Sequence, residues 1–348
     1  MKTVLITTTI NVPRVLELYR KAGAAVPIIV MGDKKTPHAD VRRFAATIGN
    51  LSYYDVHDQE RLGYRCSPII GWNTIMRRNI AILEALRLDP DCVVTIDDDN
   101  IPVNLEYFRD VERIIGSPFS GLCAEPRDGW FNAAEFLSPP TFHRGFPYSK
   151  RHSMRDINMR PATNAKIGVV AGLWAGDPDI DAMTRIAIRP AAYSWARLVD
   201  EGIAVSPAAY APYNTQNTAF HAELIPLMYV WVGVGRYDDI WSSYAAQRVA
   251  RDLGYHVHFG KPFVWQERNV QNLWTNLENE MLGMRHTDDL VEKLEELSFK
   301  SLDPVDRLEE VFSGLRDLSF IPSRTIEAGL AFCEDVRTVK RKPAQVGA

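Results

Sequence analysis

Three consecutive carboxylates, Asp97, Asp98 and Asp99, follow the apolar segment Val93-Val94-Thr95-Ile96. An apolar run without polar alternation predicts a central strand of a sheet, with the carboxylates at its end. Unit charges about 4 Å apart repel by about 4 kcal/mol at an effective dielectric of about 20, so the triplet calls for a divalent cation or basic partners. Oxygen ligands suit Mg²⁺ or Mn²⁺, which bridge to a diphosphate. We expect extended backbone to place Asp97 and Asp99 on one side, where they hold such a cation; the alternative is a solvated acidic turn.

A second acidic pair, Asp238 and Asp239, follows Gly233-Val234-Gly235-Arg236. The glycines permit a tight turn, and Asp239 could cap a helix at 240–253. Alternatively, these carboxylates face a sugar, where they bind hydroxyls or stabilise an oxocarbenium-like centre. Arg236 could contact phosphate or pair with the aspartates.

Basic residues cluster at Arg77-Arg78 and again between Arg144 and Arg151. Arginine forks fit phosphate oxygens bidentately, so both clusters are candidates to bind a diphosphate, with a solvated surface as the alternative. His256 and His258 alternate on an expected strand. Because no third ligand lies near them in the sequence, we favour a packing or surface role over a metal site.

The elements that must position these residues alternate between strand and helix patterns through the first hundred residues. We expect strands at 3–9, 26–31, 51–54 and 92–96, and helices at 13–22, 40–48 and 73–88. This βαβα order predicts an α/β protein with a mainly parallel, doubly wound sheet, in which ligands collect at the carboxyl ends of strands.

Downstream, residues 116–235 are rich in proline, glycine and aromatic side chains, which is typical of long loops that carry function. Near the C-terminus we expect Thr287 to cap one helix, Asp303-Pro304 to begin a second, and Arg324 to Asp335 to form a third. We interpret the chain as a domain at 1–285, a helical C-terminal extension at 286–336 and a flexible tail at 337–348.

Composition excludes several classes of protein. With 46% hydrophobic and 24% charged residues among 348, the chain can bury a large core and is not intrinsically disordered. Its 40 basic and 44 acidic residues give a net charge of -4, so it has no global attraction to nucleic acid or anionic lipid. We expect no membrane span, because no apolar stretch of about 20 residues occurs. The cysteines share no CxxC spacing, which favours reduced thiols and a cytoplasmic protein; they are Cys66, Cys92, Cys123 and Cys333.

Several segments together resemble a known family. Three recur in the family's order, namely Arg144 to Arg151, Gly172-Leu173-Trp174 with Pro178 to Ala182, and Gly235 to Trp241; Asn217 to Phe220, Lys261 to Trp265 and the acidic triplet are also similar. Over roughly residues 1–285 the chain resembles the reversibly glycosylated polypeptides, the UDP-arabinopyranose mutases of plants. Its N-terminal third, with Thr8 to Asn11 and Gly32 to Pro37, looks more like the related STELLO-type glycosyltransferase-like proteins.

The resemblance implies a GT-A-like fold with a mixed sheet, a nucleotide-sugar substrate and a divalent metal, usually Mn²⁺. It implies that Asp97 faces the nucleotide ribose and Asp99 the metal, and that Arg151 occupies the position glycosylated in the plant proteins. The substrate-binding residues expected are Thr8, Asn11, Asp33, Arg77, Arg78, Asp97, Asp98, Arg144, Trp174, Asn217 and Arg236, and the catalytic residues expected are Arg151, Asp238 and Asp239.

Two departures from the family pattern bear on function. Gln266 stands where the plant family has a histidine, a plausible metal ligand, so metal affinity is expected to be weak or a water to substitute. Lys150 replaces an apolar residue beside Arg151.

Our leading hypothesis is a mutase that interconverts pyranose and furanose forms of a nucleotide-linked sugar, by reversible cleavage of the anomeric carbon–diphosphate bond with ring opening and reclosure. The alternatives are a metal-dependent GT-A glycosyltransferase, with an acceptor cleft lined by Trp130, Phe131 or Trp174, and a non-catalytic scaffold, which Gln266 favours. Association of identical chains is left open.

Overall fold

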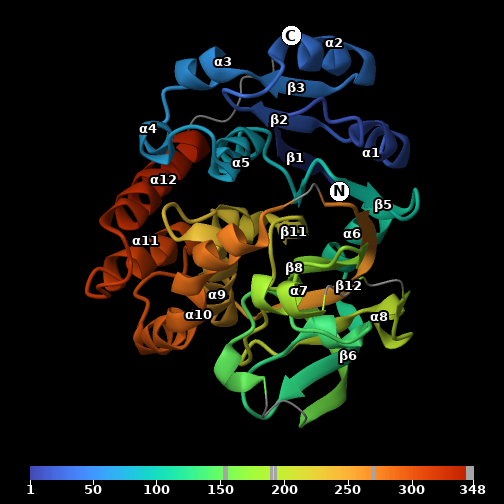
Figure 1. Cartoon of the computed structure of the whole chain (residues 1–348), viewed down its shortest axis with the longest axis vertical. Coiled ribbons are helices and arrows are strands. Elements are labelled where there is room, and N and C mark those ends of the chain that lie inside the picture. Colours follow the sequence, from blue (N-terminus) through green and yellow to red (C-terminus); the bar gives the residue numbers. More distant parts are fainter. Residues whose placement is uncertain (152–155, 189–190, 192–193, 269–270, 342–348) are drawn as a thin grey trace.

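The computed structural model describes residues 1–151, 156–188, 191, 194–268 and 271–341 (Figure 1). The strands are β1 (Thr3–Thr9), β2 (Ile28–Gly32), β3 (Leu51–Tyr54), β4 (Cys92–Ile96), β5 (Asn100–Pro102), β6 (Phe119–Pro126), β7 (Leu137–Ser138), β8 (Ile157–Gly176), β9 (Ser194–Trp195), β10 (Ile203–Val205), β11 (Asn217–His221) and β12 (Tyr255–Gln266). The helices are α1 (Leu16–Ala22), α2 (His38–Ile48), α3 (Val56–Arg61), α4 (Cys66–Ile70), α5 (Arg78–Leu86), α6 (Tyr107–Ile115), α7 (Ala182–Ile188), α8 (Leu198–Glu201), α9 (Asp238–Arg251), α10 (Leu273–Glu296), α11 (Pro304–Gly314) and α12 (Ser323–Arg341).

The N-terminal part of the sheet is parallel, as predicted. Its strands lie in the order β3-β2-β1-β4, of which β1, β2 and β3 are labelled in blue at the top of Figure 1, and helix α5 packs against β1 and β2. Strands β2 and β4 are buried along their whole length, which is why neither shows polar alternation in the sequence. The expected bounds of β1, β3 and β4 are confirmed residue for residue. Because β1, β2 and β4 run the same way, their carboxyl ends meet at one edge of the sheet.

The remainder of the sheet is built largely from residues 116–235, so the expectation of an irregular middle region was wrong. Strand β11 pairs antiparallel with β4 and with β8, and β8 also pairs with β6 and β12. Strand β10 joins β6 to β12, which closes these strands into a ring. Within the described residues the sheet therefore has ten strands of mixed direction. The glycines and prolines that suggested loops lie partly inside β8 itself, whose first half is largely exposed.

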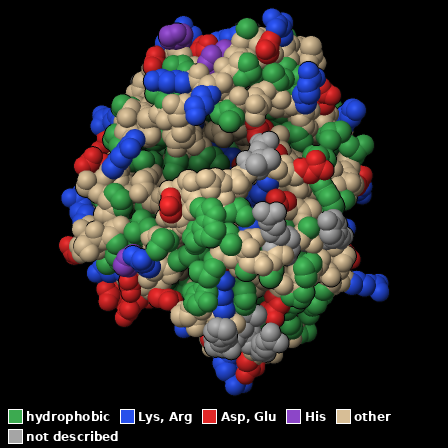
Figure 2. Space-filling view, viewed as in Figure 1, with side chains coloured by type: hydrophobic (Ala, Val, Ile, Leu, Met, Phe, Trp, Pro, Cys, Tyr) green, Lys and Arg blue, Asp and Glu red, His purple; other side chains and the backbone are tan. Residues whose placement is uncertain are grey.

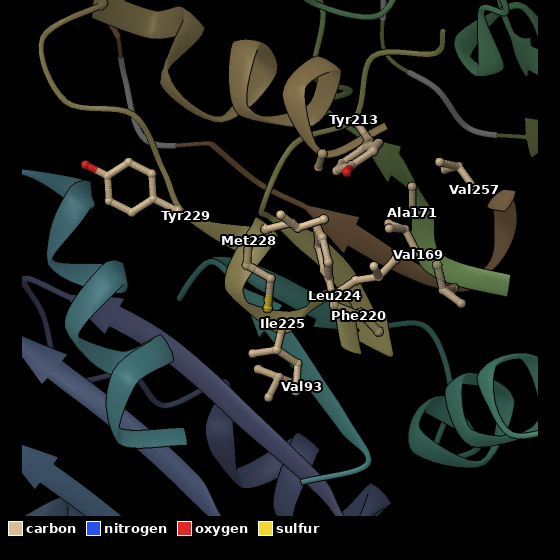
Figure 3. Close-up of a cluster of buried hydrophobic side chains, with 14 of the residues drawn as sticks. Val93, Val169, Ala171, Tyr213, Phe220, Leu224, Ile225, Met228, Tyr229 and Val257 are labelled. Atoms are coloured by element: carbon tan, nitrogen blue, oxygen red, sulfur yellow. The ribbon is translucent and has the colours of Figure 1, made fainter. Parts of the chain in front are cut away.

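A continuous apolar core links the two parts of the sheet. Figure 3 shows Val93 of β4, Val169 of β8 and Phe220 of β11 with residues of the short 3₁₀ helix η4 (Ala222–Met228). Each of these side chains is almost completely buried. Burial of a large aliphatic or aromatic side chain contributes about 1.5–3 kcal/mol, so this seam holds β4, β8 and β11 at fixed positions.

The C-terminal helices pack onto the body of the molecule. Helix α11 lies against α9 and η4, and α12 lies against α4 and α5. Asp335 of α12 accepts the backbone N–H groups of Arg65 (3.0 Å) and Cys66 (2.9 Å), which ties this helix to the N-terminal half. The mixed α/β architecture with C-terminal helices is consistent with a GT-A-like fold. None of the described helices is long and apolar enough to cross a membrane.

Two expectations for these helices need correction. Thr287 does not cap a helix, because it lies inside α10. That helix is capped by Asn272, whose side chain accepts the N–H groups of Trp274 and Thr275. Helix α12 continues to Arg341, past its expected end near Asp335 and past the start expected for a tail, and residues 342–348 lie outside the described residues. The start of α11 after Asp303 is confirmed. The division into domains at 285 and 336 stays a prediction.

The four cysteines are buried and none is paired in a disulfide, and their reduced state stays a prediction. His256 and His258 both lie on β12, and the described residues contain no group of three potential metal ligands. His258 is fully buried and packs edge-on against Phe119 (5.1 Å between ring centroids), which agrees with a packing role.

Candidate functional site

A pocket of about 330 Å³ lies at the carboxyl ends of β1, β2 and β4. Its lining brings together the acidic triplet, the end of β1 and the segment before α5, as the parallel strand order predicted. The lining residues are Thr8, Thr9, Ile10, Met31, Asp33, Lys35, Asn73, Thr74, Ile75, Arg77, Asp97, Asp98 and Asp99. Asn11, expected to bind substrate, is exposed and is not among the lining residues.

The acidic triplet forms a turn between β4 and β5, in which the N–H of Asn100 donates to the carbonyl of Asp97 (3.2 Å). The expected extended backbone was therefore wrong, although Asp97 and Asp99 do line the same pocket. The carboxylates of Asp97 and Asp98 accept hydrogen bonds from Arg78 (2.5 Å) and Thr9 (2.5 Å) respectively. Asp99 accepts only a long one from Asn100 (3.4 Å) among the described residues.

Burial disfavours the charged form of the last two carboxylates in this turn. Desolvation, reinforced by the charges of Asp97 and Asp98, raises the pKa of Asp99 to about 6, while the charge of Arg268 opposes the shift. Desolvation also raises the pKa of Asp98, against the hydrogen bond from Thr9. The turn is thus a partly buried cluster of negative charge that favours cationic or hydrogen-donating partners.

Arg77 and Arg78 are both almost completely buried, so neither lies on a solvated surface. Arg77 lines the pocket, stacks 4.0 Å from the centre of the Trp72 ring and donates to Gln59 (2.8 Å), and its second terminal nitrogen has no partner among the described residues. Burial lowers the pKa of Arg77 to about 10. Arg78 instead points to Asp97 and to Thr215 (2.6 Å) before β11, where it positions the acidic turn.

Asp33 was expected to contact substrate, and it lines the pocket at the end of β2. Its carboxylate accepts the backbone N–H groups of Lys34 (2.6 Å), Asn73 (2.7 Å) and Thr74 (2.9 Å). These bonds fix the chain that leads into the 3₁₀ helix η1 (Ile75–Arg77) and thereby place Arg77 at the pocket wall.

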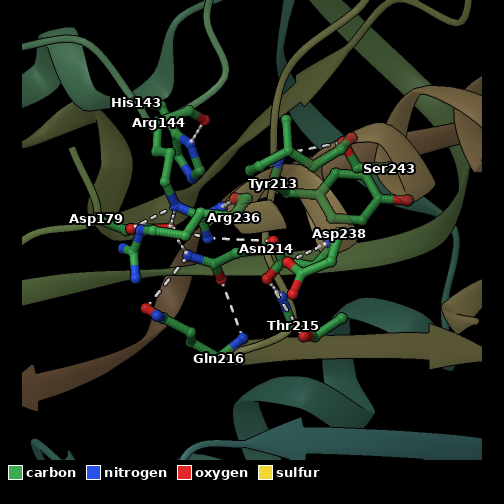
Figure 4. Close-up of polar contacts among 12 residues, drawn as sticks. His143, Arg144, Asp179, Tyr213, Asn214, Thr215, Gln216, Arg236, Asp238 and Ser243 are labelled. Atoms are coloured by element: carbon green, nitrogen blue, oxygen red, sulfur yellow. Dashed lines mark hydrogen bonds and ion pairs between the residues drawn. The ribbon is translucent and has the colours of Figure 1, made fainter. Parts of the chain in front are cut away.

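A second polar cluster is centred on a buried ion pair between Arg144 and Asp179 (Figure 4). Arg144 donates from two nitrogens to Asp179 at 2.9–3.1 Å and from one to Asp239 (3.1 Å). Asn214 also donates to Asp179 (2.7 Å), and the N–H of Thr215 donates to Asp239 (3.0 Å). The carboxylates raise the pKa of Arg144 despite burial, and the two arginines that face Asp179 hold its pKa well below the usual range.

Asp238 and Asp239 begin helix α9, and Asp239 is not its N-cap as expected, because Tyr237 occupies that position. Asp238 accepts the N–H of Asp239 (2.8 Å), and burial together with the charge of Asp239 raises the pKa of Asp238. Arg236 pairs with the buried Glu280 (2.9 Å) rather than with the aspartates.

Arg151 lies in a different pocket from the acidic turn. That pocket measures about 490 Å³ and is also lined by Phe142, Tyr148 and Met183. The guanidinium of Arg151 lies over the rings of Phe142 (4.8 Å) and Tyr148 (5.1 Å) and pairs with Asp181 (2.5 Å). The structure therefore does not bring Arg151 into the pocket that holds the triplet.

The remaining candidates lie in the interior. Trp174 packs against His143 (5.3 Å between ring centroids), and Asn217 accepts from Tyr107 (2.5 Å) and donates to the carbonyl of Pro262 (2.9 Å). Trp130, Phe131 and Trp174, expected to line an acceptor cleft, are all buried in the core, so that expectation was wrong.

Sequence reasoning missed the residues that lie between the triplet and the Arg144 cluster. Arg268 approaches Asp179 (3.2 Å), Gln266 (3.3 Å) and Gln216 (3.4 Å), and it acts electrostatically on Asp99. The polar run at 214–216 before β11 was a usable signal, whereas nothing in the sequence marked Arg268. Figure 2 shows that this face of the molecule is hollowed near its centre, with acidic and basic side chains inside the hollow.

Comparisons with known proteins agree with the resemblance drawn from the sequence. A probable UDP-arabinopyranose mutase 4 of Arabidopsis thaliana is 28% identical over 57% of this chain and 53% of its own length. A probable UDP-arabinopyranose mutase 1 of Pisum sativum is 30% identical over 59% and 52%, and UDP-arabinopyranose mutase 1 of Oryza sativa is 28% identical over 57% and 53%. The chain thus spans about half the length of the curated relatives it matches.

The family model described as reversibly glycosylated polypeptide matches residues 76–311. The match begins after the first 75 residues and extends past 285 into α11, so it covers a different stretch from the expected 1–285. The likeness of the N-terminal third to STELLO-type proteins stays a prediction. Because the match covers more than half of the chain and includes both the acidic turn and the Arg144 cluster, this chain belongs to the reversibly glycosylated polypeptide family.

Proposed function

We propose that this chain is a nucleotide-sugar mutase that interconverts pyranose and furanose forms of the sugar. The observation that carries the proposal is the pocket at the carboxyl ends of β1, β2 and β4, lined by carboxylates, hydroxyls and Arg77, in a chain whose relatives are named UDP-arabinopyranose mutases. Its volume of about 330 Å³ falls within the range of small-ligand sites.

In this proposal the pocket binds the nucleoside diphosphate. Thr8 and Asp97 face the nucleoside, and the unpartnered nitrogen of Arg77 is available for a phosphate oxygen. Asp33 contributes by holding the backbone that carries Arg77. The charges of Asp98 and Asp99 face the same pocket, which restricts where the diphosphate can lie.

The proposed reaction conserves all atoms of the substrate. The diphosphate leaves the anomeric carbon with the bonding electron pair, and a different hydroxyl oxygen of the same sugar then bonds to that carbon and gives up its proton. The bond from the anomeric carbon to the original ring oxygen breaks as that oxygen takes up a proton, which opens the old ring, and the diphosphate returns to the anomeric carbon. No electrons are gained or lost. Asp239, fixed by Arg144 and Thr215, would bind a sugar hydroxyl or stabilise positive charge at the anomeric carbon. Asp238, whose pKa is raised, would donate or accept the proton that ring opening and reclosure exchange.

A divalent cation at Asp97 and Asp99 stays a prediction. Carboxylate oxygens suit Mn²⁺ or Mg²⁺. However, Asp97 already pairs with Arg78, and the amide oxygen of Gln266 accepts from Arg268, so the donors described do not fit a cation held by this chain alone. We therefore assign no step of the reaction to a metal.

The test is to incubate the purified chain with UDP-, GDP- and dTDP-linked sugars and to separate the products by chromatography with mass detection. A mutase gives an isomer of equal mass, whereas a glycosyltransferase gives free nucleoside diphosphate and a heavier acceptor. Asp99→Asn should slow isomerisation at least tenfold, because this carboxylate has the weakest internal partner of the triplet. Glu106→Gln, at an exposed pair with Arg109, is the matched control and should leave the rate unchanged. Normal binding of nucleotide sugars without any change of ring form would refute the proposal in favour of a scaffold.

A further inference from the structure

Gln266 and Arg268, at the end of β12, lie beside the acidic turn. Gln266 is the cross-strand partner of Asn100 in the β12–β5 ladder. The side-chain oxygen of Asn100 accepts the N–H of Asp97 (3.1 Å), and its amide nitrogen approaches Asp99 (3.4 Å). Asn100 therefore connects Gln266 to Asp97 and Asp99, two of the carboxylates that line the 330 Å³ pocket.

Both side chains keep a buried donor without a partner among the described residues. Gln266 is 1% exposed, its oxygen accepts from Arg268, and its Nε2 amide group has no acceptor. The side chain of Arg268 is 7% exposed, and its Nε–H has no acceptor either. A buried donor without an acceptor destabilises the protein, so two of them side by side indicate a ligand that brings acceptor oxygens.

The positive charge of Arg268 favours an anionic ligand at these donors, although it also acts on Asp99 of the acidic turn. Asp97 is paired with Arg78, and Asp98 is hydrogen-bonded to Thr9. Arg268 approaches Asp179 at 3.2 Å, but Asp179 is already bonded to Arg144 by three closer contacts. The guanidinium of Arg268 is consequently only weakly paired, and its long contacts of 3.2–3.4 Å leave it free to make a stronger bond.

We propose that Arg268 and the free amide of Gln266 bind the terminal phosphate of a nucleoside diphosphate, so that this chain binds that ligand without a divalent cation. The inference rests on the proposed function, since it concerns the same ligand. A guanidinium matches phosphate oxygens in charge and geometry. Its permanent positive charge would neutralise the phosphate, which is the role that a bound divalent cation would otherwise have. The orientation of Gln266, with its oxygen toward Arg268, leaves its donor end for the ligand.

The experiment measures the dissociation constants of a nucleoside diphosphate and the matching monophosphate by calorimetry, in EDTA and in Mn²⁺. The probe is whichever of UDP, GDP and dTDP gives the largest thermal shift. We expect the diphosphate to bind wild type in EDTA within about tenfold of its affinity in Mn²⁺. Arg268→Gln should weaken diphosphate binding in EDTA at least tenfold and leave monophosphate binding unchanged. Arg160→Gln, at an exposed pair with Glu125, is the control and should bind both ligands as wild type does.

Two further variants guard against misfolding and test the role of the amide. Gln266→Leu removes the donor without changing charge and should weaken diphosphate binding alone, with circular dichroism to check the fold. Gln266→His introduces the residue of the plant family and should increase the ratio of affinity in Mn²⁺ to affinity in EDTA. Binding of the diphosphate by wild type only in Mn²⁺, or equal binding by wild type and Arg268→Gln in EDTA, would contradict the inference and leave the proposed function intact. Absence of nucleotide binding under every condition would overturn both.

Discussion

Replacement of Asp179 by Asn tests whether the buried charge cluster holds the two halves of the candidate site together. The Asp179 side chain is 1% exposed and faces Arg144, Arg268 and Asn214. Removal of one partner of a buried ion pair costs about 3–5 kcal/mol, because the opposite charge stays buried without compensation. Arg144 retains Asp239 at 3.1 Å, so we expect the lower part of that range, about 3 kcal/mol.

Chemical denaturation monitored by circular dichroism measures this loss, and at about 2 °C per kcal/mol the melting temperature should fall by about 6 °C. Glu106→Gln, which removes only an exposed pair, should cost less than about 1 kcal/mol. The pKa of Asp179 is depressed in the folded state, so its contribution is fully present above the unfolded pKa of about 3.9 and is lost as the pH falls below that value. The stability difference between wild type and Asp179→Asn should therefore be constant from pH 5 to 8 and shrink in stronger acid. A variant as stable as wild type at pH 7 would refute this reasoning.

Three further predictions concern other parts of the chain. Gly283→Ala should destabilise the protein by about 1–3 kcal/mol in denaturant titrations, because the added methyl group would overlap the ring of Tyr237; an unchanged midpoint would show that the ring yields freely. The pKa of Asp238 is higher in the folded state than in the unfolded state, so the protonated side chain favours folding at low pH and wild type loses this stability as the pH rises. Asp238→Asn should therefore gain stability relative to wild type between pH 6 and 8.5, and a pH-independent difference would contradict this. The four buried cysteines should react with a thiol reagent only after denaturation, and prompt reaction of the native protein would contradict their burial.

The parallel half of the fold was predictable because its signals are local. Strands β2 and β4 are continuous apolar runs, and the Asp303-Pro304 pair marks the start of α11 through its own side chain and ring. The middle region was not predictable, since β8 draws its stability from three neighbouring strands that lie far away in the sequence. Thr287 misled for the same reason: its hydroxyl bonds to Trp241 across a helix interface, which no local pattern reveals.

The residues of the candidate site likewise fall into those that a local sequence pattern reveals and those that it does not. Asp97, Asp98 and Asp99 stand out as a run at the end of a strand, and their pocket followed from strand direction alone. Arg268 gave no signal, because its importance comes from partners contributed by separate segments of the chain. Arg151 gave a strong motif signal but lies in another pocket, since sequence order does not fix the distance between loops.

The long strand β8 has a consequence for the order in which the protein assembles during synthesis. Strands β1 to β4 pair among themselves and complete their contacts with one another once the first hundred residues have left the ribosome. Strand β8 must wait for β12, whose last residue is Gln266, before both of its sides are covered. Until β12 has been translated, the second half of β8, which is buried in the folded chain, has an uncovered edge, and unpaired strand edges of this kind make a nascent chain prone to aggregation.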